Sequence, residues 1–358
     1  MPVILTRYLY FLDECFHSLL MALINKTSFK EVVFWTGEIY YSGFEDKLRN
    51  HIWKIYYDFY AVKFPKYEKK INKIPNTLES FIYILNLLYY SSVSYDVFVM
   101  RMSSFKLPRH IYMGGHPEWL KQLKLRRKEK LFIRSLHDKR FGNVRYYLKF
   151  IEDDRCYDII KSYFEKIHSY TLKNKISIGY HDKQHIIMAI ICHLSMDEEQ
   201  IQHRTIFRKL DPKIVFHEVE FNEEKISPLY KTLAHKRIYN VTPLMGIFKL
   251  ERYSIPNIDY KDILRLYWDY FAYNSPLWKA RIKAQNGKPI DLPDKYCLEF
   301  SSDDNEESFY EEYNYEPDEQ PLGVQEKSIG TIGKSKQWLN MIRGKYKWAK
   351  KAKWNQIY

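Results

Sequence analysis

The sequence predicts a mostly α-helical protein, an irregular stack of helical hairpins with minor β structure and a C-terminal tail that is first acidic and then basic. The chain of 358 residues has only 12 Gly and 14 Pro, too few for a loop-rich or all-β protein, while 46% of its residues are hydrophobic. Its patterned stretches carry apolar residues every three or four positions, which is typical of helices with one buried face. One stretch, KIVFHEVEF at 213–221, alternates and predicts a short strand.

The first helices are predicted from their boundaries. Ser28 and Glu31 have the spacing of a capping box, and the helix that follows them stops at Ser42–Gly43. The next helix starts near Glu45 and ends at Pro65, because the residue before proline is pushed out of the helical region. The side chains that form its apolar stripe are Leu48, Ile52, Ile55, Tyr56, Phe59 and Val62. Further helices are predicted at about 77–91, 94–105, 118–136, 143–170, 181–204 and 259–272.

One aromatic phrase occurs twice, as IYYDFYAVKFP at 55–65 and as LYWDYFAYNSP at 266–276. Lys54 stands four residues before Asp58, and Arg265 stands four before Asp269, so each acid shares a helical face with a base. We therefore interpret the shared Asp as structural. Two copies without a fixed period indicate either a degenerate helical repeat or convergence on a good aromatic helix.

Composition shifts divide the chain. The stretch PRHIYMGGHPEW at 108–119 concentrates Pro and Gly and predicts a boundary. No Lys or Arg occurs from Cys297 to Glu326, and nine acidic residues lie between 303 and 319. We expect an N-terminal helical domain over 1–107, a break at 108–117, a second helical region over 118–296, an acidic linker over 297–332 and a basic aromatic tail over 333–358.

The net charge of +13 indicates either an acidic partner, such as nucleic acid or an acidic protein, or only the codon bias of an AT-rich genome. Four scattered cysteines without a CxxC pair predict a reducing compartment. The apolar N-terminus is interrupted by charges, and no run reaches the ~20 apolar residues of a membrane span. We therefore expect neither a signal peptide nor a span.

Two basic segments are the candidate binding sites. The block at 121–149 has eleven Lys and Arg against two acids, with Arg126, Arg127, Lys128 and Lys130 at its centre. The tail interleaves Trp with Lys, a mixture that suits RNA or single-stranded DNA, because Lys neutralises phosphates and Trp stacks on bases. Its candidate contacts are Lys345, Lys347, Trp348, Lys350, Lys351, Lys353 and Trp354. Alternatively, the tail folds back onto the chain's own acidic segment, or its Trp residues dock into a partner protein.

GYHDKQHIIMAIICHL at 179–194 permits a metal hypothesis, because His181, His185 and Cys192 fall on one helical face. A metal-dependent hydrolase using His181, Asp182 and His185 is the third functional alternative. It would need an earlier His and a later Asp, for which His168 and Asp211 are available. The competing interpretation is a buried apolar helix. The sequence has no Walker loop, GxGxxG, GxSxG or kinase motif, so we expect no cofactor and favour a non-enzymatic protein.

Several phrases carry a family resemblance: FWTGEIYYSGF at 34–44, IWKIYYDFYAVKFP at 52–65, WDYFAYNSPLWKARI at 268–282 and YEPDEQ at 315–320. They resemble conserved uncharacterised proteins of nucleocytoplasmic large DNA viruses, of the mimivirus or algal-virus kind. The resemblance implies residence in the virus factory of the host cytoplasm, or packaging in the virion. It assigns no catalytic residue.

Together these observations predict a basic helical adaptor that binds nucleic acid or nucleoprotein in viral gene expression or packaging. The second hypothesis is a virion structural or assembly protein whose Trp- and Lys-rich tail docks into a partner. In the first hypothesis, the acidic segment acts as an internal mimic that loosens non-specific binding.

Overall fold

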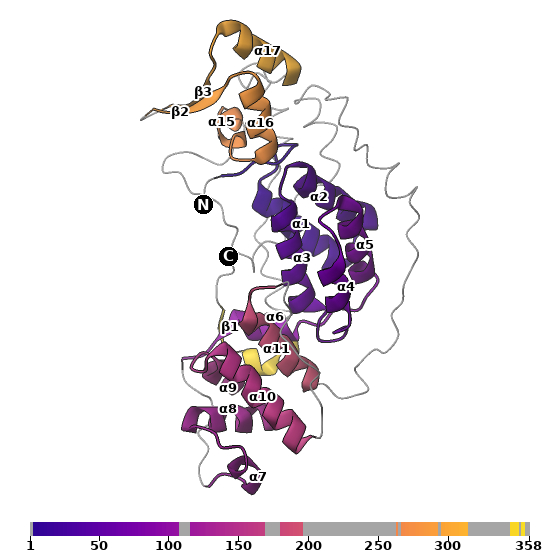
Figure 1. Ribbon diagram of the computed structural model, residues 1–358, viewed down its shortest axis with the longest axis vertical. Helices are drawn as coiled ribbons and strands as arrows, with labels where there is room; N and C mark the ends of the chain where they lie inside the picture. Colours follow the sequence, from indigo (N-terminus) through magenta and orange to yellow (C-terminus); the bar gives the residue numbers. More distant parts are fainter. Residues whose placement is uncertain are drawn as a thin grey trace.

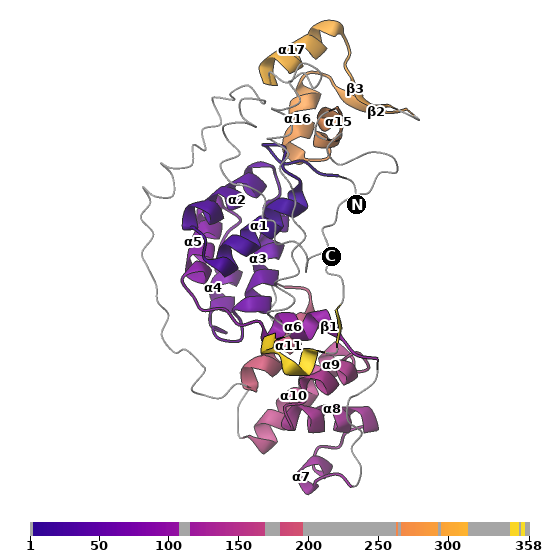
Figure 2. The same cartoon turned by 180° about the vertical axis from the view of Figure 1, so that it is seen from behind.

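The computed structural model confirms a mostly α-helical protein with little strand. It describes residues 3–106, 115–168, 180–195, 263, 266–292, 295–313, 344–350 and 352–354. The predicted strand at 213–221 and Lys351 lie outside these residues. The elements form three groups that follow one another along the long axis (Figures 1 and 2).

The middle group is a bundle of α1 (Leu12–Asn25), α2 (Phe29–Tyr41), α3 (Glu45–Phe59), α4 (Tyr67–Lys73) and α5 (Leu78–Tyr89) (Figure 1). As predicted, the Ser28 hydroxyl accepts a hydrogen bond from the Glu31 amide at 3.1 Å. Helix α2 ends before Ser42, and Gly43 follows in the left-handed region with φ of 84°. The predicted apolar stripe of the next helix is fully buried.

One predicted boundary of this bundle is wrong. Helix α3 ends at Phe59, six residues before Pro65, where the Phe59 carbonyl, and the Val62 carbonyl beyond the helix, bond to other segments. The Phe59 carbonyl accepts from the Ser94 amide at 2.8 Å, and the Val62 carbonyl bonds to the His193 ring at 2.7 Å. The proline therefore follows the end of the helix without causing it.

The second group contains α6 (Asp96–Met102), α7 (Glu118–Lys121), α8 (Arg127–His137), α9 (Phe141–Leu148), α10 (Asp153–Ile167) and α11 (Lys183–Leu194) (Figure 1). The helices predicted at 118–136 and 143–170 are each split in two. In both cases a connecting turn buries an apolar side chain, Leu123 in the first and Ile151 in the second. Neither turn contains Gly or Pro, so the helical periodicity of the sequence runs through it. Two residues of this region, β1 (Ser103–Ser104), pair antiparallel with β4 (Lys353–Trp354).

The third group contains α15 (Trp268–Ala272), α16 (Pro276–Ala284), the hairpin of β2 (Lys288–Leu292) and β3 (Lys295–Glu299), and α17 (Asp303–Tyr313). Phe309 and Tyr313 of α17 are buried against Trp268 and Trp278. Residues 297–313, predicted as part of an acidic linker, therefore belong to the fold. Their exposed acids lie at the end of the molecule opposite to α8 in both views (Figures 1 and 2).

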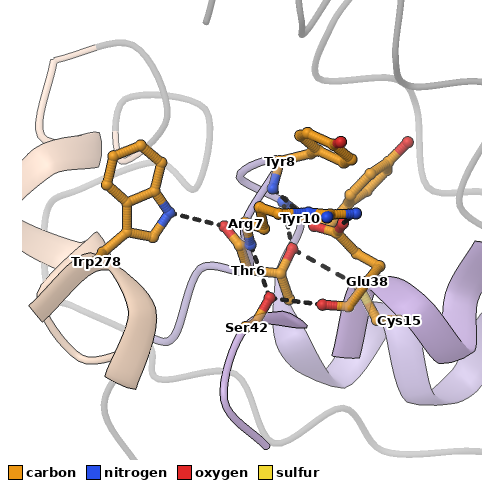
Figure 3. Close-up of polar contacts among 8 residues, drawn as sticks. All are labelled: Thr6, Arg7, Tyr8, Tyr10, Cys15, Glu38, Ser42 and Trp278. Atoms are coloured by element: carbon orange, nitrogen blue, oxygen red, sulfur yellow. Dashed lines mark hydrogen bonds and ion pairs between the residues drawn. The ribbon is translucent and has the colours of Figure 1, made fainter. Parts of the chain in front are cut away.

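The N-terminal segment before α1 joins the middle group to the third (Figure 3). The Trp278 indole N–H donates to the Thr6 carbonyl at 3.0 Å, while the buried Glu38 carboxylate accepts from the Tyr8 amide at 2.7 Å and pairs with Arg7 at 3.4 Å. Four apolar side chains of the same segment enter the core of the third group: Val3, Leu5, Leu9 and Phe11. The core of the third group is thus completed by the beginning of the chain.

We expect Gly43→Ala to lower the free energy of unfolding by roughly 2 to 4 kcal/mol, because it combines backbone strain with overpacking. A Cβ at Gly43 would lie 2.6 Å from the Pro276 Cβ, at a backbone φ of +84°. The control is Gly115→Ala, whose added Cβ meets nothing within 4 Å. Chemical denaturation followed by circular dichroism measures both. Equal effects of the two substitutions would show that the contact with Pro276 contributes nothing.

Candidate functional site

The basic block forms an exposed face on α8 and on the turn before it. Arg126, Arg127 and Lys128 are exposed, and Lys130 is half-buried. The opposite side of the helix carries Phe132, Ile133 and Leu136 into the core. Arg126, Arg127 and Lys128 are thus consecutive exposed cations, whereas Lys130, on another side of the helix from Lys128, is half-buried.

Glu129, one of the two acids inside the block, is paired with Arg155 and offsets the charge of this face only in part. Glu129 is buried, and its carboxylate accepts from the Arg126 backbone amide at 2.8 Å. Its two oxygens also accept from the Arg155 guanidinium at 3.0 and 3.1 Å. The hydrogen bond from Arg155 is the main reason why the pKa of Glu129 lies below its ordinary value. Glu129 thus caps α8 and binds Arg155 of α10.

An aromatic ring that the sequence interpretation missed lies beside these cations. Phe150 follows α9 and is 45% exposed. The Lys128 Nζ lies 3.9 Å from its ring centroid, and the Lys149 Nζ lies 5.0 Å from it. The Tyr146 ring lies 5.3 Å away, centroid to centroid. We call Arg127, Lys128, Lys149, Phe150 and Tyr146 the basic aromatic face. The signal in the sequence is the adjacent Lys149–Phe150 pair at the end of the basic block.

The described part of the tail folds onto the second group of helices. Tyr346 and Ala349 are buried, and burial is the main reason why the pKa of the Tyr346 hydroxyl is raised. Trp348 is half-buried and lies 6.3 Å from Phe105 and 6.0 Å from Phe141, between ring centroids. Stacking of Trp348 on a base would require this packing to open.

The tail lysines are placed differently from its tryptophan. Lys345, Lys347 and Lys350 are exposed. The Lys345 Nζ lies 5.5 Å from the Tyr95 ring centroid. Lys353 and Trp354 form β4 through their backbones. The described tail packs on α6, α9 and β1. This packing favours the prediction that the tail folds back onto the chain. The surface that it meets is the helical body, however, and not the acidic segment.

Within the described residues, His181, His185 and Cys192 do not form a metal centre, and the prediction that they share one helical face is wrong for His181. His181 lies before α11 (Lys183–Leu194) and is exposed, because the Asp182 carboxylate begins the helix by accepting from the His185 amide at 3.0 Å. Both ring nitrogens of His185 are bonded, Nε2 to Asp58 at 2.8 Å and Nδ1 to the Tyr180 hydroxyl at 2.9 Å. Cys192 is buried, which raises the pKa of its thiol. Within the described residues, no three His, Cys, Asp or Glu side chains come together as a metal site.

Asp58 of the first aromatic phrase is the centre of a buried charge cluster. The Arg101 guanidinium donates to both of its oxygens, at 3.0 and 2.6 Å, and the His185 Nε2–H donates to one of them. Burial raises the pKa of this carboxyl, but Arg101 and His185 together hold it well below the ordinary value. The cluster links α3, α6 and α11, so the interpretation of Asp58 as structural agrees with its surroundings, although its partner is Arg101 and not Lys54.

Asp269 is the equivalent residue of the second phrase, and the pKa of its carboxyl is raised where that of Asp58 is lowered. Asp269 is buried and accepts from the Tyr310 hydroxyl at 2.7 Å. Burial raises the pKa of this carboxyl, and the hydrogen bond from Tyr310 offsets the effect only in part. Each phrase therefore places a buried acid near a helix end. Asp58 is paired with Arg101 and His185, whereas Asp269 accepts a hydrogen bond from the Tyr310 hydroxyl.

Two of the four phrases that carry the family resemblance, 34–44 and 268–282, meet in space, and the phrase at 315–320 lies outside the described residues. Gly43 of the first contacts Pro276 of the later one, and the Leu277 amide donates to the Ser42 carbonyl at 3.5 Å. Trp278 reaches the N-terminal segment beside Glu38 (Figure 3). These motifs thus form a joint between two parts of the fold.

We expect Asp58→Asn to cost about 3 kcal/mol of unfolding free energy, because it leaves the half-buried Arg101 guanidinium without its carboxylate. Asp269→Asn is the matched control. It should cost about 1 kcal/mol or less, since an amide oxygen can also accept from Tyr310. Because the folded-state pKa of Asp58 is lowered, its contribution is present above about pH 4 and is lost as the pH falls further. Urea denaturation between neutral and acid pH measures both effects. A wild-type acid sensitivity that persists in Asp58→Asn would contradict this assignment.

We expect Trp348→Ala to lower the unfolding free energy by about 1 to 3 kcal/mol, because a half-buried ring leaves the core. Lys347→Ala removes an exposed neighbour and should change it by less than about 0.5 kcal/mol. Denaturation curves and limited proteolysis of the tail report the two variants. Faster cleavage of the tail in both variants, or in neither, would show that Trp348 does not anchor it.

Comparison of the chain with protein families, with curated proteins and with solved structures finds no match in any of the three. Among the helices of the described residues, none combines the length and the apolar character needed to cross a bilayer.

Proposed function

We propose that this chain is a non-enzymatic helical adaptor that binds nucleic acid or nucleoprotein through its basic aromatic face. The observation that carries the proposal is the cluster of exposed cations at the start of α8, next to an exposed aromatic ring. Lys and Arg side chains bind phosphates and release condensed counterions, which gives affinity without sequence readout. Aromatic rings among them bind bases by stacking.

The exposed cations at the start of α8 repel one another when no acidic partner is bound. Arg126, Arg127 and Lys128 are consecutive and lie at the N-terminus of α8, where the helix dipole also presents positive charge. Glu129 offsets part of this repulsion, but it is committed to Arg155. A phosphate backbone along this face would relieve the repulsion, and it would do so less at high salt.

The tail provides additional cations on the same group of helices. Lys345, Lys347 and Lys350 are exposed on a segment that packs on α6 and α9. In this proposal the tail contributes charge from a docked position, and its Trp348 anchors it. The exposed acids of α17 lie at the far end of the molecule and leave the basic aromatic face uncovered (Figure 1).

The cellular setting belongs to the proposal as well. We infer a role in viral gene expression or packaging, in the host cytoplasm or in the virion, from the resemblance of the quoted phrases to proteins of large DNA viruses. A protein that holds viral nucleic acid in these places needs many weak phosphate contacts and no catalytic centre.

We expect the triple substitution of the exposed Arg126, Arg127 and Lys128 by Gln to weaken binding to labelled RNA and DNA by at least about tenfold at low salt. The slope of log affinity against log salt should fall by about 2 to 3 for the same reason. Fluorescence anisotropy from about 50 to 300 mM salt measures both quantities.

The matched control for this experiment removes three exposed lysines of α4 and of the turn before it: Lys66, Lys69 and Lys73. This control has the same net charge but an intact basic aromatic face. If both triple variants lose the same affinity, or if a non-nucleic polyanion binds as tightly as RNA, binding reflects net charge only and the proposal fails.

A further inference from the structure

Phe150 occupies an unusual position for a large apolar side chain. It lies in the turn between α9 and α10, where the Phe150 amide donates to the Tyr147 carbonyl at 3.0 Å and the next residue, Ile151, is buried. The turn is therefore fixed, and it directs Ile151 inward and Phe150 outward. A single exposed Phe is common on protein surfaces and indicates nothing by itself.

The neighbours of Phe150 distinguish it from an ordinary surface Phe. Two ammonium groups lie within 5.0 Å of its ring centroid, from Lys128 on α8 and from Lys149 at the end of α9. The second lysine also lies 4.5 Å from the Tyr146 centroid. Two helices thus converge to surround one exposed ring with positive charge.

We infer that Phe150 is a stacking platform for an unpaired base, and that the partner of the basic aromatic face is single-stranded nucleic acid in preference to duplex. This inference rests on the proposed function and specifies its ligand class. Base stacking on an aromatic side chain is worth on the order of 5- to 150-fold in affinity per base. An exposed cation–π contact is worth only about 2- to 5-fold. A base therefore displaces Lys128 from the ring, and the released ammonium binds the adjoining phosphate.

Duplex nucleic acid cannot use this platform in the same way. Its bases are paired and stacked on one another, so only its phosphates can reach the face. The lysines and arginines then bind both ligands, and the ring adds affinity for the single strand alone. The preference for single strands follows from Phe150, whereas the salt dependence follows from the cations around it.

The test compares the full-length chain with Phe150→Leu, which keeps an apolar side chain but has no π face, and with Phe150→Trp, which keeps one. The probes are labelled oligothymidine, oligouridine and a duplex DNA of the same length, measured by fluorescence anisotropy at fixed salt. We expect Phe150→Leu to bind both single strands about tenfold more weakly, with duplex affinity within about twofold of wild type. Phe150→Trp should retain single-strand affinity or increase it. Unfolding midpoints identical to wild type show that the exposed substitution leaves the fold unchanged.

The outcomes separate this inference from the proposed function. If Phe150→Leu binds single strands as well as wild type, or loses single-strand and duplex affinity equally, the platform does not exist. If the triple Gln variant of α8 still loses salt-dependent binding in that case, the proposed function stands without it. If neither variant changes binding of any probe, the proposed function fails together with this inference.

Discussion

The Asp58 carboxylate is the constraint on which the second group of helices depends. An ionised carboxylate in the interior is costly unless cations and hydrogen-bond donors surround it. Here the donors come from Arg101, 43 residues further along the chain, and from His185, 127 residues further along. Helices α6 and α11 are therefore fixed against α3. Helix α9 packs on α6 and α8 packs on α9, so the basic aromatic face takes its position from this buried charge.

Local signals in the sequence were enough to predict much of the middle bundle. Ser28 and Gly43 delimit α2 as expected, and every residue of the predicted stripe from Leu48 to Val62 is buried. These features depend on a few neighbouring residues, which the sequence displays directly. The turns at Leu123 and Ile151 escaped prediction, because burial by distant helices breaks those segments without any Gly or Pro.

The candidate site was predictable in charge but not in geometry. The density of Lys and Arg from 121 to 149 indicated a basic face, and Arg126, Arg127 and Lys128 are exposed on it. Phe150 could not be distinguished from a core residue, because its exposure depends on how the turn after α9 is held by Ile151. Likewise His185 and Cys192 share a helical face, as expected, but Asp58 and Tyr180 satisfy the His185 ring, and no spacing within α11 could have shown this.

The joint between Trp278 and Thr6 has a consequence for the synthesis of the chain on the ribosome (Figure 3). The four apolar side chains before α1 emerge some 270 residues ahead of their partners in α15, α16 and α17. At about 5 to 20 residues per second, the first segment waits on the order of 15 to 55 s for its partners. During that interval the middle bundle can fold around α1 while Val3, Leu5 and Leu9 remain open to any apolar surface nearby. Chaperones that bind short apolar segments would protect the stretch from Val3 to Phe11 until α15, α16 and α17 have been made.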